Sequence, residues 1–394
     1  MKNIILLMSD TFRYDNLGDR AERPVRTPEI DKFSSERATS IEKFYVGSSP
    51  TIPQRTDLAT GVLGWPHYGW QAIDLSEPNH IAEMLSLSGY ATQLICDCPH
   101  LFPARINEKF DAALQYRNQE MDMALLHLND EIRSMVPDEK TRAEPKYRGR
   151  KLVDCHRWVN NYFRSEWDSF AKQTSETTIR WLENNYKASP FFLWVDMFDP
   201  HEPWDPPEYM VRHYDPDYTG IPMLHPNYGP SSYYTPEELH NLWAHYAAKA
   251  EMTDRWIGRI FQKIDDLQLW DNSIVILLSD HGISIGEHGR TGKVNLHSAD
   301  NRNWPIYPEV GHAICLMAGG DIPKGQSLDL IAQPIDILPT LSELAEVSID
   351  PPKKLEGMSF AESIINGNNK HREYAVCGRY INPSGVTQSM KSHA

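Results

Sequence analysis

A hydroxyl group stands immediately before a predicted helix in the segment Ser48–Gly61. Pro53 suits the first turn of a helix and Gly61 suits its end, so the helix is expected between them. Thr51 then precedes the helix N-terminus, where unpaired backbone N–H groups and the helix dipole favour negative charge. Such a position could hold a phosphate or sulfate group beside the Thr51 hydroxyl. An ordinary N-cap is the alternative interpretation.

Two acidic residues and one histidine follow apolar runs that are typical of buried strands. Asp10 follows the run 3–8, and the pair Asp280 and His281 follows the run 273–278. The carboxyl ends of parallel strands meet at one sheet edge, so we expect these three side chains to lie together. Carboxylates with one imidazole suit Mn²⁺ best and leave Zn²⁺, Ca²⁺ or Mg²⁺ open, which predicts one divalent cation. Taken alone, each motif could also be a helix cap, followed in the second case by a surface histidine.

Longer motifs recur along the chain in a fixed order. Residues 9–15 read S-D-T-F-R-Y-D, residues 51–61 fit T-x-P-x-R-(x)4-T-G, residues 198–204 contain P-H-x-P, and residues 279–289 contain S-D-H-G and G-E-H-G. In this order the chain resembles the sulfatase family of the alkaline phosphatase superfamily, whose signature is C-x-P-S-R-(x)4-T-G. Thr51 replaces the Cys that this family converts to formylglycine. The resemblance implies a sulfatase-like hydrolase of phosphoric or sulfuric esters.

The resemblance also implies a role for each residue of the site. The ligands implied for the cation are Asp10, Asp280, His281 and the Thr51 oxygen. The activated Thr51 would attack phosphorus or sulfur in line. Arg55 and Lys293 would neutralise the non-bridging oxygens of the ester. His201, with His100 as the second candidate, would protonate the departing oxygen.

Three further residues have weaker support as substrate-binding residues. Many sulfatases read I-G-K-W-H-L-G where residues 95–101 of this chain read I-C-D-C-P-H-L. Asp97 therefore replaces a lysine, and it could orient His100 or contact a cationic or hydroxylated substrate. His67 follows a Trp-Pro pair where the family often has a pocket histidine. His312 belongs to a segment that resembles the family's Y-E-E-x-x-R/H-x-P element.

The nucleophile decides between the possible substrates. Hydrated formylglycine expels sulfate by collapsing to an aldehyde, whereas an ester of Thr51 must be cleared by an activated water. Superfamily members with Ser or Thr nucleophiles are mostly phosphatases and phosphodiesterases, so hydrolysis of phosphate mono- or diesters is the first hypothesis. A sulfuric ester hydrolase, arylsulfatase-like and acting on a sulfated sugar or an aryl ester, is the second. Group transfer and a catalytically silent binding protein remain, and the amount of bound metal would distinguish the last of these.

The elements that must position these residues alternate along the chain. The apolar runs are 3–8, 90–95, 191–195, 273–278 and 313–317, and the helical patterns are 79–87, 174–186, 236–267 and 335–345. This alternation predicts an α/β fold with a mostly parallel central sheet and helices on both faces. Residues 1–360 are expected to form the catalytic domain, with a helical and looped excursion at 115–167. Residues 361–394 are expected to begin a small C-terminal subdomain, which a truncation at Ala394 would leave incomplete.

Composition limits the partners of the protein. The net charge of −15 over 394 residues argues against nucleic acid and against an anionic membrane. A small-molecule anionic ester would therefore need positive charge gathered locally at the site. No run of about 18 apolar residues is present, so no membrane span is expected. Five cysteines without C-x-x-C spacing indicate reduced thiols in a cytoplasmic protein, and no pattern indicates the oligomeric state.

Overall fold

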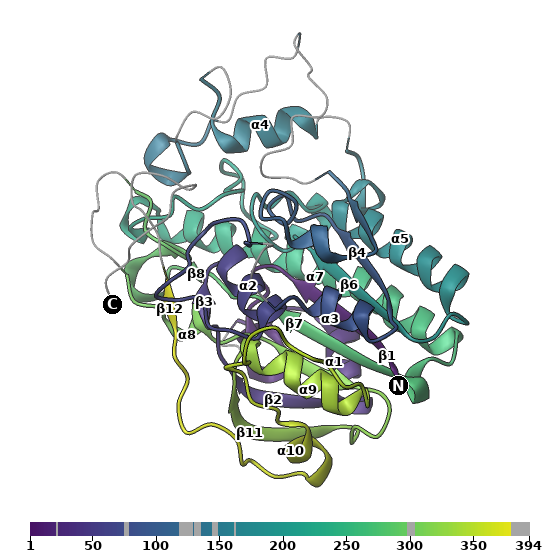
Figure 1. The fold of residues 1–394 in the computed structure, drawn as a ribbon. Coiled ribbons are helices and arrows are strands. Elements are labelled where there is room, and N and C mark those ends of the chain that lie inside the picture. The colour runs from purple at the N-terminus through teal and green to yellow at the C-terminus, as the bar shows by residue number, and fades with distance from the viewer. Residues whose placement is uncertain are drawn as a thin grey trace.

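An eight-stranded sheet forms the centre of the protein in a computed structural model (Figure 1). The structure describes residues 1–20, 23–74, 79–117, 129, 135–143, 149–160, 163–297 and 304–379. The order across the sheet is β11-β2-β10-β7-β1-β6-β4-β5. Its strands are β1 (Asn3–Ser9), β2 (Ala38–Phe44), β4 (Ala91–Cys96), β5 (Ala112–Gln115), β6 (Phe191–Met197), β7 (Ser273–Ser279), β10 (Cys315–Ala318) and β11 (Gln326–Ala332).

Most neighbouring strands of this sheet run parallel, as predicted. β1 lies between β6 and β7 and pairs in parallel with both, and β4 pairs in parallel with β5 and β6. β10 is antiparallel to both of its neighbours, β2 and β7. The five predicted apolar runs correspond to β1, β4, β6, β7 and β10. β2, β5 and β11 were not predicted: polar residues interrupt β2 and β11, and β5 is a short, mostly exposed strand at the edge of the sheet.

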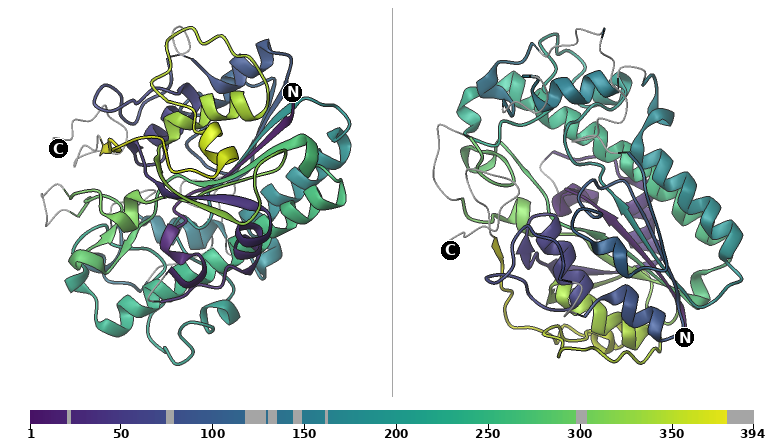
Figure 2. Two further views of the ribbon diagram at one scale, coloured as in Figure 1. Left: turned by 90° about the horizontal axis from the view of Figure 1, so that it is seen from below. Right: turned by 45° about the horizontal axis from the view of Figure 1, so that its top comes forward.

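Helices cover both faces of the sheet, and two separate cores result (Figure 2). Successive side chains of a strand point to opposite faces, so Ile4 and Leu6 of β1 enter one core and Ile5 and Leu7 enter the other. The first core contains α2, α3, α9 and α10, and the second contains α1, α5, α6 and α7. The helices are α1 (Pro28–Glu36), α2 (Ile52–Thr60), α3 (Ile81–Leu87), α4 (Leu152–Val159), α5 (Phe170–Asn185), α6 (Glu208–Val211), α7 (Pro236–Asp266), α8 (Pro308–Gly311), α9 (Ile337–Leu344) and α10 (Ala361–Asn366).

Short strands bring distant segments to the carboxyl edge of the sheet. β8 (Ser284–Ile285) and β9 (Thr291–Gly292) form a hairpin that leads to Lys293. β12 (Gly378–Arg379) pairs in parallel with β3 (Ser48–Ser49), just before Thr51. The chain after α10 therefore returns to the catalytic domain, while residues 380–394 lie outside the described residues. The predicted excursion at 115–167 contains α4, and much of the remainder also lies outside them.

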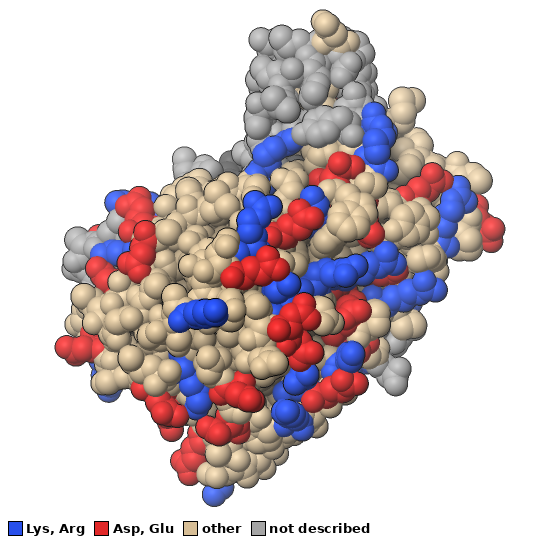
Figure 3. All heavy atoms as spheres, turned by 90° about the vertical axis from the view of Figure 1, so that its right-hand side faces the viewer, with Lys and Arg blue, Asp and Glu red and all other residues tan. Residues whose placement is uncertain are grey.

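The surface carries charge of both signs. On the face drawn in Figure 3, Lys and Arg side chains are interspersed with Asp and Glu side chains. Among the described residues, no helix has the length and hydropathy that crossing a bilayer requires. The five cysteines are thiols, four of them buried.

Candidate active site

Asp10, Asp280 and His281 lie together at the carboxyl edge of the sheet, as the motifs predicted. Ser9 of β1 is in register with Ser279 of β7, so the residues that follow the two strands are neighbours. All three side chains are fully buried, and one ligand atom from each lies within 4.8 Å of the others. His281 Nε2 is 3.3 Å from Asp280 Oδ2 and 3.8 Å from Asp10 Oδ1.

This group suits a divalent cation. Asp10 Oδ2 is buried and accepts no hydrogen bond from the described residues, and its ion pair with Arg55 Nη1 at 3.1 Å leaves a lone pair for a cation. His281 Nδ1 lies 3.0 Å from the Gly282 carbonyl and donates to it, which leaves the lone pair on Nε2, towards the two carboxylates. Burial, and then the charge of Lys293, lower the pKa of His281 to about 3. The imidazole is therefore neutral near pH 7, which is the form that binds metal ions.

The Thr51 hydroxyl faces the same group. Thr51 Oγ1 lies 3.1 Å from His281 Nε2, and because Nε2 carries the lone pair, the hydroxyl donates the hydrogen bond. Thr51 is the N-cap residue of α2, yet its side chain makes no capping hydrogen bond. Its φ of 43° and ψ of −90° are rare for a β-branched residue and cost about 1–3 kcal/mol. The ordinary N-cap interpretation therefore does not describe Thr51, because its oxygen is directed to the cluster instead.

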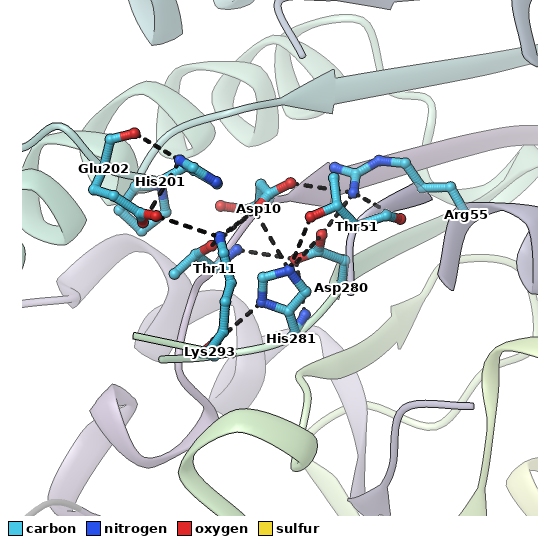
Figure 4. Close-up of polar contacts among 12 residues, drawn as sticks. Asp10, Thr11, Thr51, Arg55, His201, Glu202, Asp280, His281 and Lys293 are labelled. Carbon is cyan, nitrogen blue, oxygen red and sulfur yellow. Dashed lines mark hydrogen bonds and ion pairs between the residues drawn. The ribbon is translucent and has the colours of Figure 1, made fainter. Parts of the chain in front are cut away.

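Thr11 is a second threonine with positive φ, at 65°, beside the same cluster. Its hydroxyl donates to Asp10 Oδ1 at 2.7 Å and accepts from Lys293 Nζ at 2.9 Å, and its backbone N–H donates to Asp280 Oδ1 at 2.9 Å. Thr11 therefore fixes both carboxylates and connects them to Lys293 (Figure 4).

Arg55 is bonded differently from its predicted role. Its guanidinium makes two hydrogen bonds to Asp196, at 2.8 and 2.7 Å, and one to Asp280 at 2.6 Å. Arg55 Nη1 also lies 3.1 Å from Asp10 Oδ2, and the side chain is fully buried. Burial lowers the pKa of Arg55 and these carboxylates raise it, with a net upward shift. In this structure Arg55 is a fixed cation of the carboxylate framework, and its expected role of neutralising ester oxygens stays a prediction.

Asp196 is a site residue that the sequence analysis missed. It lies in the otherwise apolar strand β6, in register with Met8 of β1, and it is fully buried. Besides its two bonds from Arg55, it accepts one from Trp194 Nε1 at 3.2 Å. Burial raises the pKa of Asp196 to about 6, although Arg55 opposes this shift. A single carboxylate inside a continuous apolar run was the signal that could have revealed it.

Lys293 and Glu202 form the other end of the site. Lys293 Nζ lies 3.7 Å from Glu202 Oε1 and 3.9 Å from Asp10 Oδ1. Glu202 is fully buried and accepts a hydrogen bond from the Tyr228 hydroxyl. Burial opposes its ionisation, but the charges of His201 and Lys293 outweigh this, and the pKa of Glu202 falls to about 2. Glu202 was also missed, although it is the variable residue of the predicted P-H-x-P element.

His201 and His100 approach this end from two loops. His201 Nδ1 lies 2.6 Å from the Glu202 carbonyl and donates to it, and the ring stacks on Phe198 at 3.9 Å. A proton given to a leaving group would therefore come from Nε2 of His201. The His100 ring lies 5.8 Å from that of Phe198 and 5.1 Å from that of Trp70. Both predicted acid candidates thus flank Phe198.

The structure places two of the weaker candidates in other surroundings. His67 is exposed, and its backbone N–H donates to the Gly64 carbonyl at 2.7 Å. Asp97 is fully buried and accepts from Thr174 Oγ1 at 2.8 Å and from a backbone N–H at 2.5 Å, so it supports the framework instead of contacting substrate. Burial, and then Asp199, raise the pKa of Asp97 to about 8.

His312 has a structural environment as well. Its ring stacks on Tyr14 at 3.7 Å, and Nε2 donates to the Glu42 carbonyl at 2.6 Å. Both contacts are to framework residues, and the expected role of His312 in substrate binding stays a prediction.

The fold and this arrangement define an α/β hydrolase that cleaves esters. The chain belongs to the sulfatase family, because the family model described as Sulfatase matches residues 2–347. It is similar to an arylsulfatase of Clostridium perfringens (strain 13 / Type A), with 26% identity over 94% of this chain and 80% of the relative. It is also similar to human arylsulfatase K, with 24% identity over 91% of this chain and 65% of that protein. The chain thus spans just under two thirds of the latter relative.

Solved structures show the same fold. The phosphonate monoester hydrolase of Agrobacterium radiobacter superposes with a TM-score of 0.71 over 95% of this chain and 79% of the other, at 18% identity. The family match therefore gives a sulfatase-family ester hydrolase, the solved structures show the fold, and the site must indicate the substrate.

Proposed function

We propose that this protein hydrolyses phosphoric or phosphonic esters with Thr51 as the nucleophile. The observation that carries the proposal is the Thr51 hydroxyl, which is held 3.1 Å from His281 Nε2 and directed into the buried Asp10, Asp280 and His281 cluster. A strained β-branched residue that makes no capping bond is better explained by a reactive role than by helix capping.

In the proposed first step, Thr51 Oγ1 gives up its proton to bulk water, which later reprotonates His201, and attacks phosphorus in line with the leaving oxygen. A Thr51–phosphorus ester forms as the bond to the leaving oxygen breaks, and His201 Nε2 protonates that oxygen. In the second step a water attacks phosphorus, the Thr51 ester bond breaks, and the proton of the water returns a hydroxyl to Thr51. Lys293 balances the negative charge of the transferred group, while Arg55 keeps the carboxylates fixed.

Asp10, Asp280 and His281 would hold the divalent cation, and Mn²⁺ is the ion we propose for two carboxylates with one imidazole. When bound, such a cation supplies positive charge that favours an ionised hydroxyl and the charge that develops on the ester. The neutral form of His281 supports this assignment, as does Asp10 Oδ2, which accepts no hydrogen bond from the described residues although Arg55 Nη1 lies 3.1 Å away.

A sulfuric ester is the second candidate substrate. It is favoured by the arylsulfatase relatives, and it is opposed by the nucleophile. Formylglycine releases sulfate by forming an aldehyde, whereas Thr51 has no such route and its ester must be hydrolysed. Members of the superfamily with Ser or Thr nucleophiles are mostly phosphatases and phosphodiesterases, so we place phosphorus esters first.

The test combines variants of Thr51 with a substrate panel. Phosphate monoesters, phosphate diesters, phosphonate monoesters and sulfate esters with one common nitrophenyl leaving group would be assayed with Mn²⁺. We expect turnover of phosphorus esters, a loss of at least about 10⁴-fold in kcat/KM for Thr51→Ala, and substantial activity in Thr51→Ser. Thr56→Ala on the same helix is the matched control, because its hydroxyl bonds only the Ile52 carbonyl among the described residues. Turnover confined to sulfate esters, or activity in Thr51→Ala, would contradict the proposal.

A further inference from the structure

Glu202 places a buried negative charge inside a site that must bind an anion. Its Oε1 accepts from the Tyr228 hydroxyl and lies 3.7 Å from Lys293 Nζ. Its Oε2 lies 3.5 Å from His201 Nδ1 and accepts no hydrogen bond from the described residues. Burying an ionised carboxylate is unfavourable unless it is paired, and the two ion-pair contacts of Glu202, at 3.5 and 3.7 Å, are longer than the 2.6–2.7 Å pairs of Arg55.

The other charges of the site show what Glu202 changes. Arg55 already contacts three carboxylates, so Lys293 is the remaining permanent cation among the described residues of this cluster. Four carboxylates thus share two permanent cations, with Glu202 adjoining Lys293. Without the histidines, Asp10, Asp196, Asp280 and Glu202 against Arg55 and Lys293 give a net charge of −2, which one divalent cation would bring to zero. An ester with a single negative charge then binds to a site whose net charge is zero. A second negative charge on the ester is repelled by Glu202, which already interacts with Lys293.

We propose that Glu202 is a specificity-determining residue that favours esters with one negative charge over phosphate monoesters with two. The singly charged class comprises phosphate diesters, phosphonate monoesters and sulfate esters. This inference rests on the proposed function, and it narrows the substrate class for the same site. The physical cause is repulsion between Glu202 and the second charge of the ester, in a buried site where water screens poorly.

Glu202→Gln tests the inference, because it removes the charge and keeps an oxygen that accepts from Tyr228. The control Tyr228→Phe removes that hydrogen bond and keeps the charge. The readout is the ratio of kcat/KM for a nitrophenyl phosphonate monoester to that for nitrophenyl phosphate, assayed near pH 8, where the phosphate is a dianion. We expect the ratio to fall roughly 10- to 100-fold in Glu202→Gln and to stay within about threefold of wild type in Tyr228→Phe.

A binding measurement separates this inference from the proposed reaction. Metal-loaded Thr51→Ala protein, with and without Glu202→Gln, would be titrated with methyl phosphate and dimethyl phosphate by calorimetry. Glu202→Gln should tighten binding of the doubly charged methyl phosphate about 10-fold more than binding of dimethyl phosphate. Equal changes for both ligands, or a ratio shift in Tyr228→Phe as large as that in Glu202→Gln, would overturn the inference. If no ester is turned over, the proposed function fails, while this titration still tests charge selection.

Discussion

The two ends of the site use charge in different ways (Figure 4). At one end, Arg55 is fully buried and bonds Asp196 and Asp280 at 2.6–2.8 Å. At the other end, Lys293 reaches Glu202 at 3.7 Å, and one oxygen of Glu202 accepts no hydrogen bond from the described residues. At the Arg55 end the charges are paired by short hydrogen bonds. At the Lys293 end the ion pair is longer, so Lys293 and Glu202 can still interact with the charge of a bound ester.

This difference indicates which residues hold the site and which meet the substrate. A cation that is fully bonded to carboxylates has little left to offer an anion, and its loss leaves buried charges uncompensated. A cation with loose partners can shift its interaction to an incoming ester. We therefore expect variants at the Arg55 end to reduce stability, and variants at the Lys293 end to change rates and specificity.

Apart from Thr51, the variant expected to remove both the bound cation and the activity is at Asp280, a residue that contacts Arg55 and belongs to the proposed cation site. Asp280→Ala removes a proposed metal ligand and a partner of Arg55, so bound divalent cation should fall from about one equivalent to none. Activity should fall by about 10³-fold or more, since a catalytic metal supplies several kcal/mol. Elemental analysis and kcat/KM are the measurements.

Two further variants make this result interpretable. His281→Ala should also lose the cation while leaving every carboxylate partner of Arg55 in place, so it separates metal loss from misfolding. Asp254→Asn is a control at a carboxylate that instead accepts from backbone N–H groups of α1, and it should keep the cation. Full metal occupancy in Asp280→Ala would remove the basis for the site.

His201→Ala should act on the rate alone. If His201 protonates the departing oxygen, the variant should lose about 10²–10⁴-fold on alkyl esters and much less on nitrophenyl esters, whose leaving groups need little protonation. The free energy of unfolding, measured with urea, should change little in comparison, because His201 belongs to the Lys293 end of the site. An equal loss on both ester types would assign His201 to binding instead.

Asp196→Asn should act mainly on stability. The substitution replaces the carboxylate that accepts two hydrogen bonds from Arg55 and leaves Asp10 and Asp280 as the charged partners of the guanidinium, so the expected loss is that of a buried hydrogen bond left unmade, about 1–3 kcal/mol. Urea denaturation would measure the loss. Glu202→Gln is the matched comparison, because it removes a charge that folding favours, whereas burial disfavours the ionised form of Asp196. A loss in Asp196→Asn would therefore report its hydrogen bonds to Arg55, and unchanged stability would contradict a structural role for the Arg55 end.

Much of this fold could be predicted from the sequence because its central strands are buried on both faces. β1, β6 and β7 are continuous apolar runs, and each was recognised from them. β2 and β11 lie farther out and mix polar with apolar residues, so no continuous run marked them. The long amphipathic α7 was predicted to within one residue of its observed end.

The site was predictable where contacts follow from neighbouring residues and not where they depend on packing. Asp10, Asp280 and His281 follow strand ends, so sheet topology alone brought them together. The partners of Arg55 depend on strand register and on the direction of α2, which local sequence does not specify. For the same reason a motif match could not show that Asp97 bonds Thr174 and that His312 stacks on Tyr14.

The smallest predicted effect is a pH dependence of the free energy of unfolding, caused by Glu202 at the Lys293 end. The pKa of Glu202 in the folded protein is about 2, below its usual 4.5, so folding favours the ionised form. The stability that this contributes is fully present above pH 4.5 and is lost as the pH falls towards 2. Between pH 4.5 and about pH 3.5 the loss amounts to about 1 kcal/mol.

Glu202→Gln cannot take up this proton. Its free energy of unfolding, measured by urea denaturation at a series of pH values, should therefore decrease by about 1 kcal/mol less than that of wild type over this window. Glu362→Gln, at an exposed carboxylate, should follow the wild-type curve because exposed charges contribute little. Parallel curves for wild type and Glu202→Gln would mean that His201 and Lys293 do not hold Glu202 ionised. The Lys293 end would then lack the negative charge on which its difference from the Arg55 end depends.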